Sequence, residues 1–451
     1  MKKNFLLCAA LLLILGADAQ FIKRLGDRAK QKMEQKAGDK VDKGIDDAVD
    51  GKKKDKKSKS GTEEKKDDSR SADGQTSNGP TTDETVSSDG NNAGSGAPAP
   101  PASLKTYSKY DFVPGEKILV YEDFSQDAIG DFPGKWNTNS SGEIVTLGDK
   151  EGKWFKLDKT GIFHPEFITS LPDNFTLEFD LGANNKFSFY STELNMNIAN
   201  MTDPGVDYKN WGYYVRWNGK HALNFRIHPN GAGGGKGNSR IVTSVSGSSL
   251  IDNTVDVNEF YAPTKNIVHL SFWRQNQRLR VYANSVKIWD LPKAFAAGGV
   301  YNSVVFGTSQ FHKEEDFYVL SNIRLAVGTP DTRNKLITEG KFVTHGILFD
   351  VNSDQIKPES YGAIKDIATV LKENNGVKVK IIGHTDSDGD DKANIDLSKR
   401  RAESVKTALV KEFSLDVSRI ETDGKGESQP VDKSETPVGK AMNRRVEFIK
   451  L

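Results

Sequence analysis

A polar run around residue 384 and an arginine further along carry the clearest candidate chemistry in this sequence of 451 residues. The run Gly383-His384-Thr385-Asp386 provides a carboxylate, and Arg401 provides a guanidinium. A carboxylate accepts hydrogen bonds and a guanidinium donates several in a planar fork, so together they can hold a ligand with both signs of charge without any covalent step. An arbitrary Asp and Arg more often pair with each other, and on these residues alone that interpretation stays open.

A second candidate is a pair of carboxylates, Glu178 and Asp180, which strand alternation places on one face. Glycoside hydrolysis needs two suitably placed carboxyl groups. In laminarinase-type hydrolases a further glutamate follows such a pair, whereas here Gly182 and Ala183 follow. The acid/base is missing, and we expect a protein that is not an enzyme.

We expect neither a metal nor a cofactor. Asp203, Asp207 and Asp290 lack the ligand spacing of a calcium loop, and scattered acids of this kind are usually solvated. Trp154, Trp211, Trp217 and Trp273 could stack on sugars if they were exposed, but aromatic side chains more often pack in sandwich cores.

The first residues indicate export. Lys2 and Lys3 precede an apolar run over residues 5–15, and Ala17-Asp18-Ala19 provides a small-x-small cleavage site, so residues 1–19 are predicted to be a signal peptide. Cys8 lies inside the apolar run, where it is not placed to carry a lipid anchor. The mature chain would have no cysteine and no disulfide, so its domains must rely on apolar cores. A net charge of +1 gives no sign of nucleic-acid binding.

Two non-globular segments are expected next. Apolar residues recur every three or four positions over residues 20–50, which predicts an amphipathic helix, either on a surface or self-associating as a coiled coil. Contact with a membrane surface is the alternative. Residues 51–103 are almost free of apolar side chains and end in a Pro-rich stretch, which predicts a disordered linker.

Residues 104–330 have the alternation of strands with one buried face, most clearly over 175–181, 223–227 and the hairpin 268–281. No long helical pattern interrupts them, which favours a β-sandwich. The region resembles laminin G or concanavalin A-like jelly rolls in Tyr121-Glu122-Asp123-Phe124, in the stretch 269–289 and in Ser321-Asn322-Ile323-Arg324-Leu325. An outer-membrane β-barrel is the alternative architecture, although strand spacing here is uneven.

In residues 340–451 the spacing of apolar residues changes again, from strand alternation alone to a mixture of strand and helix periods. Strands are expected at 342–349, 377–382, near Ile420 and near Val446, with helices at 358–374 and 394–413. The predicted order is β-α-β-α-β-β, an α/β domain.

Several separated motifs of this last region resemble the OmpA-like peptidoglycan-binding domain. They are Phe349-Asp350, Gly383-His384-Thr385-Asp386, Leu397-Ser398 with Arg401-Ala402, Gly424-Lys425-Gly426-Glu427 and Asn443-Arg444-Arg445-Val446. The resemblance implies that Asp386 and Arg401 hold the diaminopimelate of the stem peptide. It further implies that Thr385 and Asn394 shape the loop and touch ligand, and that Arg444 rather than Arg445 lies near the pocket. Lys425, Ser434 and Lys440 depart from the family pattern at the pocket edge.

The sequence therefore predicts non-covalent peptidoglycan binding that anchors the outer envelope to the cell wall. The expected location is the periplasm, in association with the outer membrane and wall, and the sandwich would be an accessory binding domain for a glycan or protein. The alternatives are an outer-membrane β-barrel with a peptidoglycan-binding tail and a wall-tethered carbohydrate-active enzyme.

Overall fold

The computed structural model describes residues 110–451 except 149, 211–220, 246–247 and 329–330. All of these lie in one unit of the chain, Gly96–Leu451. The predicted signal peptide, amphipathic helix and linker, together with Trp211 and Trp217, fall outside the described residues.

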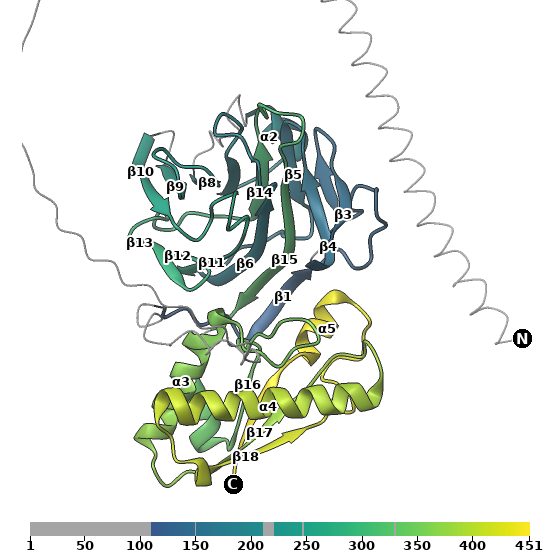
Figure 1. Cartoon of the computed structure of the whole chain (residues 1–451). Coiled ribbons are helices and arrows are strands. Elements are labelled where there is room, and N and C mark those ends of the chain that lie inside the picture. Colours follow the sequence, from purple (N-terminus) through teal and green to yellow (C-terminus); the bar gives the residue numbers. More distant parts are fainter. Residues whose placement is uncertain (1–109, 149, 211–220, 246–247, 329–330) are drawn as a thin grey trace, which may run out of the picture. The chain divides into compact units, whose positions relative to one another are not determined.

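Alternating apolar residues in the middle region build two antiparallel sheets (Figure 1). The first contains β1 (Lys117–Glu122), β3 (Glu143–Leu147), β4 (Lys150–Leu157), β6 (Asn174–Ala183), β11 (Ile267–Gln275), β12 (Arg278–Ala283), β13 (Val286–Leu291) and β15 (Tyr318–Val327). Its order is β13-β12-β11-β6-β15-β4-β3, and β1 also pairs with β15. We call it sheet A.

The second sheet, sheet B, has seven strands. They are β2 (Trp136–Thr138), β5 (Gly161–Pro165), β7 (Leu194–Ala199), β8 (His221–His228), β9 (Gly237–Val245), β10 (Ser248–Val257) and β14 (Ser303–Thr308). The order is β10-β9-β8-β7-β14-β5-β2, and a short helix, α2 (Pro204–Asn210), follows β7. The predicted strands at 175–181 and 223–227 and the hairpin at 268–281 are confirmed in β6, β8 and β11–β12.

The two sheets pack face to face around a mainly aliphatic and aromatic core. Phe179 of β6 stacks on Phe272 of β11 in sheet A, with ring centroids 5.8 Å apart. Phe225 of β8 in sheet B meets Phe272 edge-on at 4.9 Å. The expected sandwich is therefore confirmed, and Trp154, which is 4% exposed, is buried within it.

The prediction of only one buried face was wrong for sheet A. Thr176 and Glu178, on the face away from the core, are each 3% exposed. Tyr110 and Phe112, from the segment before β1, lie in a buried cluster with Tyr282 on this face. A covering segment far away in the sequence cannot be inferred from strand alternation, because alternation reports only which residues share a face.

The C-terminal region forms a third, four-stranded sheet flanked by helices (Figure 1). Its elements are β16 (Lys341–Thr344), α3 (Tyr361–Glu373), β17 (Val379–Gly383), α4 (Asp391–Phe413), β18 (Ile420–Gly424), α5 (Pro437–Asn443) and β19 (Val446–Lys450). Short turns of helix occur at Asn334–Thr338, Pro358–Ser360 and Val417–Arg419. The sheet order is β16-β19-β17-β18, and within it only β17 and β18 are parallel.

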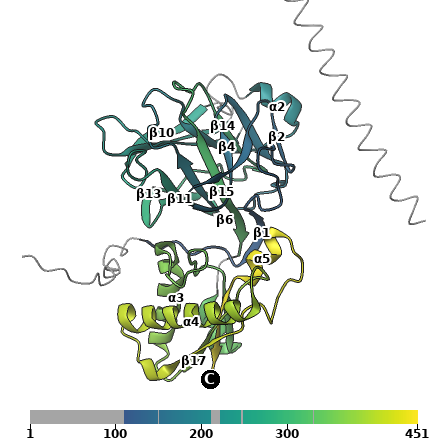
Figure 2. The ribbon, with the colours of Figure 1, turned by 45° about the vertical axis from the view of Figure 1, so that its right-hand side comes forward.

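Helices α3 and α4 lie side by side (Figures 1 and 2) and share a core with the sheet. Ile367 of α3 and Val405 of α4 belong to the same buried cluster as Ile381 of β17. The buried stripe of α3, which includes Ile364 and Leu371, follows the three-and-four spacing that predicted the helix.

The predicted β-α-β-α-β-β order needs one correction, because α5 precedes the last strand. Thr436 caps this helix by accepting a hydrogen bond from Gly439 N, and Pro437 occupies its first turn. The first strand also ends at Thr344, while Phe349 forms an isolated bridge with Ile356. Helix α5 is too short to show an apolar period, which is why the pattern of the sequence missed it.

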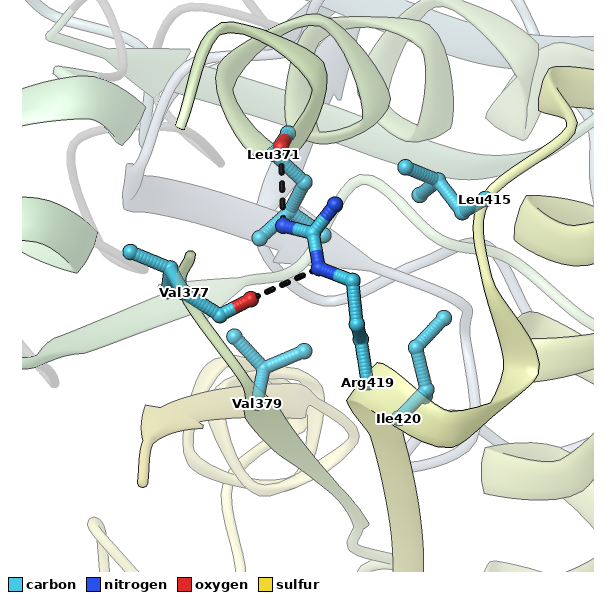
Figure 3. A pocket seen from close by; sticks show the side chains of 6 residues that line it. All are labelled: Leu371, Val377, Val379, Leu415, Arg419 and Ile420. Carbon is cyan, nitrogen blue, oxygen red and sulfur yellow. Dashed lines mark hydrogen bonds between the residues drawn. The ribbon is translucent and has the colours of Figure 1, made fainter. Parts of the chain in front are cut away.

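An apolar crevice lies below the end of α3 (Figure 3). Its lining residues are Leu371, Val377, Val379, Leu415, Arg419 and Ile420. Arg419 Nε donates to Val377 O at 2.9 Å, and Nη2 donates to Leu371 O at 2.9 Å. The arginine thus donates hydrogen bonds to carbonyl groups that would otherwise lack partners near the helix end. We therefore assign the crevice a structural role.

Within the described ranges, no helix combines the length and apolarity needed to cross a bilayer.

Candidate functional site

The candidate loop, residues 384–390, connects β17 to α4. A Cβ on Gly383 would lie 2.1 Å from the carbonyl oxygen of Ser398 in α4, so only glycine lets the strand end this close to the helix. The loop backbone is tied down where His384 N donates to Arg445 O and Thr385 N to Gly426 O, both at 3.0 Å. Loop, helix and the turn after β18 therefore form one rigid frame.

Asp386 presents its carboxylate at the edge of this frame. Its side chain is 13% exposed, and Oδ2 accepts a hydrogen bond from Arg444 Nη1 at 2.5 Å. Oδ1 accepts from Asp388 N at 3.3 Å. Asp386 is thus a nearly buried anion paired with Arg444, not with Arg401.

Arg401 projects from α4 toward the segment after β16. Its Nε donates to Ser353 O at 2.9 Å and its Nη2 to Asp350 O at 3.2 Å. The guanidinium also lies over the ring of Phe349, with Cζ 4.9 Å from the centroid. Among the described residues Nη1 has no hydrogen-bond partner, so one edge of the fork remains available for a ligand.

Asp386 and Arg401 still influence each other. Burial lowers the pKa of Arg401 from its ordinary value, and the charge of Asp386 partly offsets this. Arg401 remains a cation at neutral pH because an arginine titrates far above it. The candidate site therefore combines the Asp386 carboxylate with two arginines, Arg401 and Arg444, that differ in how far their donors are engaged.

Asn394 holds the loop from inside. It is 6% exposed, and its side-chain amide donates to Asp388 O at 3.0 Å and to Glu427 Oε2 at 2.7 Å. These contacts agree with the predicted loop-shaping role. Thr385 is also buried, and its Oγ1 has no hydrogen-bond partner in the described part of the chain. Ligand contact by either residue stays a prediction.

The adjacent arginines face in different directions. Arg444 reaches Asp386, whereas Arg445 is 5% exposed and donates from Nε to Glu447 Oε1 at 3.0 Å. His384 belongs to the same buried group, with Nε2 at 3.5 Å from Glu447. Arg445 and His384 therefore belong to the buried group around Glu447, and of the two adjacent arginines only Arg444 reaches the candidate site.

The three departures from the family pattern have local partners. Lys440 Nζ binds Asp388 at 2.6 Å, and Lys425 Nζ binds Asp423 at 3.1 Å. Ser434 Oγ lies 2.8 Å from Thr436 Oγ1, at the cap of α5. Each of the three side chains therefore bonds to a neighbouring residue of the protein.

Sequence reasoning did not assign roles to the carbonyl groups of Asp350 and Ser353, to Glu427 or to Tyr121. The run Phe349-Asp350 and the Gly-x-Gly-Glu run ending at Glu427 were visible as motifs, so a signal existed for two of them. Carbonyl acceptors leave no signal in side-chain type, because every residue carries one.

The two carboxylates of the middle region that the sequence singled out, Glu178 and Asp180, both have protein partners. Glu178 pairs with Arg324 at 2.6 Å, and Asp180 with His269 at 2.6 Å. Asn322 Nδ2 donates to the other oxygen of Asp180 at 2.7 Å. No group of three potential ligands among His, Cys, Asp and Glu lies together in the part of the chain that the structure describes.

Comparison with known proteins locates the similarity in the C-terminal region. Residues 348–444 match the OmpA family. The outer membrane porin F of Pseudomonas fluorescens is 45% identical over 101 residues, covering 22% of this chain and 31% of that protein. The probable lipoprotein YiaD of Escherichia coli is 42% identical over 104 residues, covering 23% of this chain and 47% of that protein. This chain thus spans less than half the length of either relative.

Solved structures match about a quarter of the chain. The peptidoglycan-associated lipoprotein from Burkholderia pseudomallei is 23% identical with a TM-score of 0.23, covering 27% of this chain and 100% of that one. The cell wall anchor of the T6SS from Pseudomonas aeruginosa is also 23% identical, with a TM-score of 0.22, covering 26% of this chain and 92% of that one. By their match to the OmpA family, residues 348–444 of this chain are an OmpA-like domain, of the periplasmic, peptidoglycan-binding kind found in outer-membrane proteins and lipoproteins.

Proposed function

We propose that this chain binds the diaminopimelate of the peptidoglycan stem peptide through Asp386 and Arg401 and so anchors the outer envelope to the wall. The observation that supports it best is that Arg401 stands within electrostatic reach of Asp386 without pairing with it. Its Nη1 is left for a ligand carboxylate, while Asp386 offers its charge to the ligand ammonium.

The free end of diaminopimelate carries an ammonium and a carboxylate, which match these two side chains. Each charge-assisted hydrogen bond contributes about 1.5 to 3 kcal/mol net. A few such bonds support binding in the micromolar to millimolar range, which the many sites on the wall strengthen by avidity. Binding requires no bond to be made or broken.

The sandwich is proposed to be an accessory domain of the laminin G or concanavalin A-like type, extending from about residue 104 to 330. The pairing of Glu178 with Arg324 supports a non-catalytic role, because a carboxylate engaged in this way is a poor general acid. The proposed domain boundaries follow the change from alternating to helical periods along the chain.

The test is co-sedimentation of the full chain with purified diaminopimelate-type peptidoglycan. Asp386→Asn and Arg401→Ala should each reduce binding at least about tenfold, the loss of one charge-assisted bond. The matched controls are Asp396→Asn and Arg400→Ala, which alter an exposed ion pair on the same helix. The controls should bind as the unmodified chain does.

Peptidoglycan that carries lysine in place of diaminopimelate provides the ligand control, because lysine lacks the second carboxylate. Retention of the unmodified chain should fall on this material. Equal retention on both materials, or undiminished binding by folded Asp386→Asn and Arg401→Ala variants, would refute the proposed function.

A further inference from the structure

Arg444 is in contact with a residue of the sandwich. Its guanidinium lies over the ring of Tyr121, with Cζ 5.1 Å from the centroid, while its Nη1 binds Asp386. Tyr121 belongs to β1, and Arg444 follows α5, so the contact joins two regions of the unit Gly96–Leu451. A cation within about 6 Å of a ring face is attracted to it.

Tyr121 is itself held in place by sheet A. It pairs with Arg324 in the β1–β15 register, and its hydroxyl donates to Asn322 Oδ1 at 3.2 Å. Rotation of the ring away from Arg444 would break this hydrogen bond. The ring is therefore a fixed surface against which the long side chain of Arg444 rests.

The segment that carries Tyr121 is packed against the C-terminal region at further points. A Cβ on Gly362 of α3 would lie 1.8 Å from Phe112 O, and one on Gly346 would lie 2.8 Å from the ring of Pro114. Lys335 forms an ion pair with Glu116. These contacts make the position of β1 beside the Asp386 loop part of one packed arrangement.

Arg444 is also anchored at its backbone, since its N–H donates to Lys440 O at 3.0 Å at the end of α5. With both the backbone and the guanidinium held, few rotamers remain for the side chain. Such preorganisation reduces the entropy lost on binding. Without the ring, the hydrogen bond to Asp386 alone would hold the guanidinium, and more rotamer freedom would be lost when a ligand binds.

We propose that Tyr121 of the sandwich is a positioning residue of the peptidoglycan site, holding Arg444 beside Asp386 as a second arginine for the ligand carboxylate. The inference rests on the proposed function of Asp386 and Arg401 and adds that the site is complete only with the sandwich present. The run Tyr121-Glu122-Asp123-Phe124, which first suggested a jelly roll, then also has a role in binding.

The test is a double-mutant cycle on the full chain, with affinity for a soluble stem peptide ending in meso-diaminopimelate as the readout. Tyr121→Leu keeps an apolar side chain but removes the ring face, and it should weaken binding about threefold to tenfold. Tyr121→Phe keeps the ring and loses only the hydrogen bond to Asn322, so it should bind within about twofold of the unmodified chain. In an Arg444→Gln background, Tyr121→Leu should have no further effect.

Unchanged or tighter binding by Tyr121→Leu would overturn the inference, as would an equal loss in the Arg444→Gln background. Asp386→Asn and Arg401→Ala, measured in the same series, separate the two proposals. If these variants lose binding while Tyr121→Leu does not, the inference alone is wrong. If the unmodified chain does not bind the peptide, both are wrong. Thermal unfolding of each variant checks that it is folded.

Discussion

Asp386 is bound by Arg444 at 2.5 Å, although Arg401 is the arginine with which the proposed function pairs it. Arg401 instead donates to the carbonyl groups of Ser353 and Asp350. The structure thus divides the work among two arginines. Arg444 binds the Asp386 carboxylate, which is 13% exposed, whereas Nη1 of Arg401 has no hydrogen-bond partner among the described residues.

The adjacent residues Arg444 and Arg445 should differ in how much their removal lowers the free energy of unfolding. Arg445→Ala should lower the free energy of unfolding by about 1.5 to 3 kcal/mol, because it removes the charge-assisted hydrogen bonds from Arg445 to the buried Glu447, which keeps Lys341 and His384 as neighbours. Arg444→Ala should lower it by about 1 kcal/mol or less, because that side chain is 33% exposed, and should weaken peptidoglycan binding. Denaturant unfolding and co-sedimentation of both variants provide the measurement, and an inverted order of stability would contradict the assignment.

His269 should make stability depend on alkaline pH. Burial alone would lower its pKa, but hydrogen bonds to Asp180 and Glu178 outweigh this and raise the pKa to about 10. Because the folded-state pKa is above the ordinary value of 6.5, the stabilisation is complete below pH 6.5 and is lost as pH rises toward 10. Arg324 pairs with Glu178, Asn322 donates to Asp180, and the charges of Glu359 and Lys357 also act on this group.

The measurement is the free energy of unfolding between pH 6 and about 10 for the unmodified chain and His269→Gln. The difference between the two should be largest near pH 6 and should shrink as pH rises. A difference that stays constant would mean that folding does not shift the pKa of His269, and one that grows as pH rises would mean that His269 is neutral in the folded protein.

Gly362→Ala should be strongly destabilising, by about 3 kcal/mol, because the new Cβ would collide with the backbone oxygen of Phe112. Replacing glycine by alanine in a helix otherwise stabilises the folded state. A loss of stability would therefore report the close approach of Phe112 O to Gly362. Gly376→Ala is the matched control, since nothing lies within 4 Å of its Cβ position, and it should change the unfolding midpoint little. A neutral Gly362→Ala variant would mean that the segment around Phe112 does not pack on α3.

Asn394→Ala should lower both stability and peptidoglycan binding. It removes the amide that holds Asp388 O and Glu427, which costs about 1 to 3 kcal/mol and loosens the loop that presents Asp386. Asn374→Ala, which loses a side-chain bond to Val370 O at the end of α3, should affect stability alone. Co-sedimentation of the two variants at a temperature where both are folded distinguishes these outcomes.

Much of the fold could be predicted because it depends on local patterns. The period-two alternation of Phe175 to Leu181 and the three-and-four spacing of Ile364 to Leu371 each encode an element within a few residues. The predicted start of helix α4 differs from the observed start by only a few residues. Its N-cap, Asp390, depends on neighbouring residues and is therefore a local feature as well. Helix α5 was missed because seven residues are too few to show a period.

The sequence by itself determined the order of the C-terminal elements apart from α5, the two kinds of domain and the motif that carries Asp386 and Arg401. Only the tertiary structure decided that Arg444 takes the Asp386 carboxylate, that Arg445 turns inward to Glu447, and that Tyr121 lies against the site. The physical reason is range. A strand or helix repeats its pattern over neighbouring residues. The ion pair of Asp386 with Arg444 instead joins side chains 58 positions apart, and the contact of Arg444 with Tyr121 joins side chains still further apart. Packing of the whole unit selects among chemically equivalent partners.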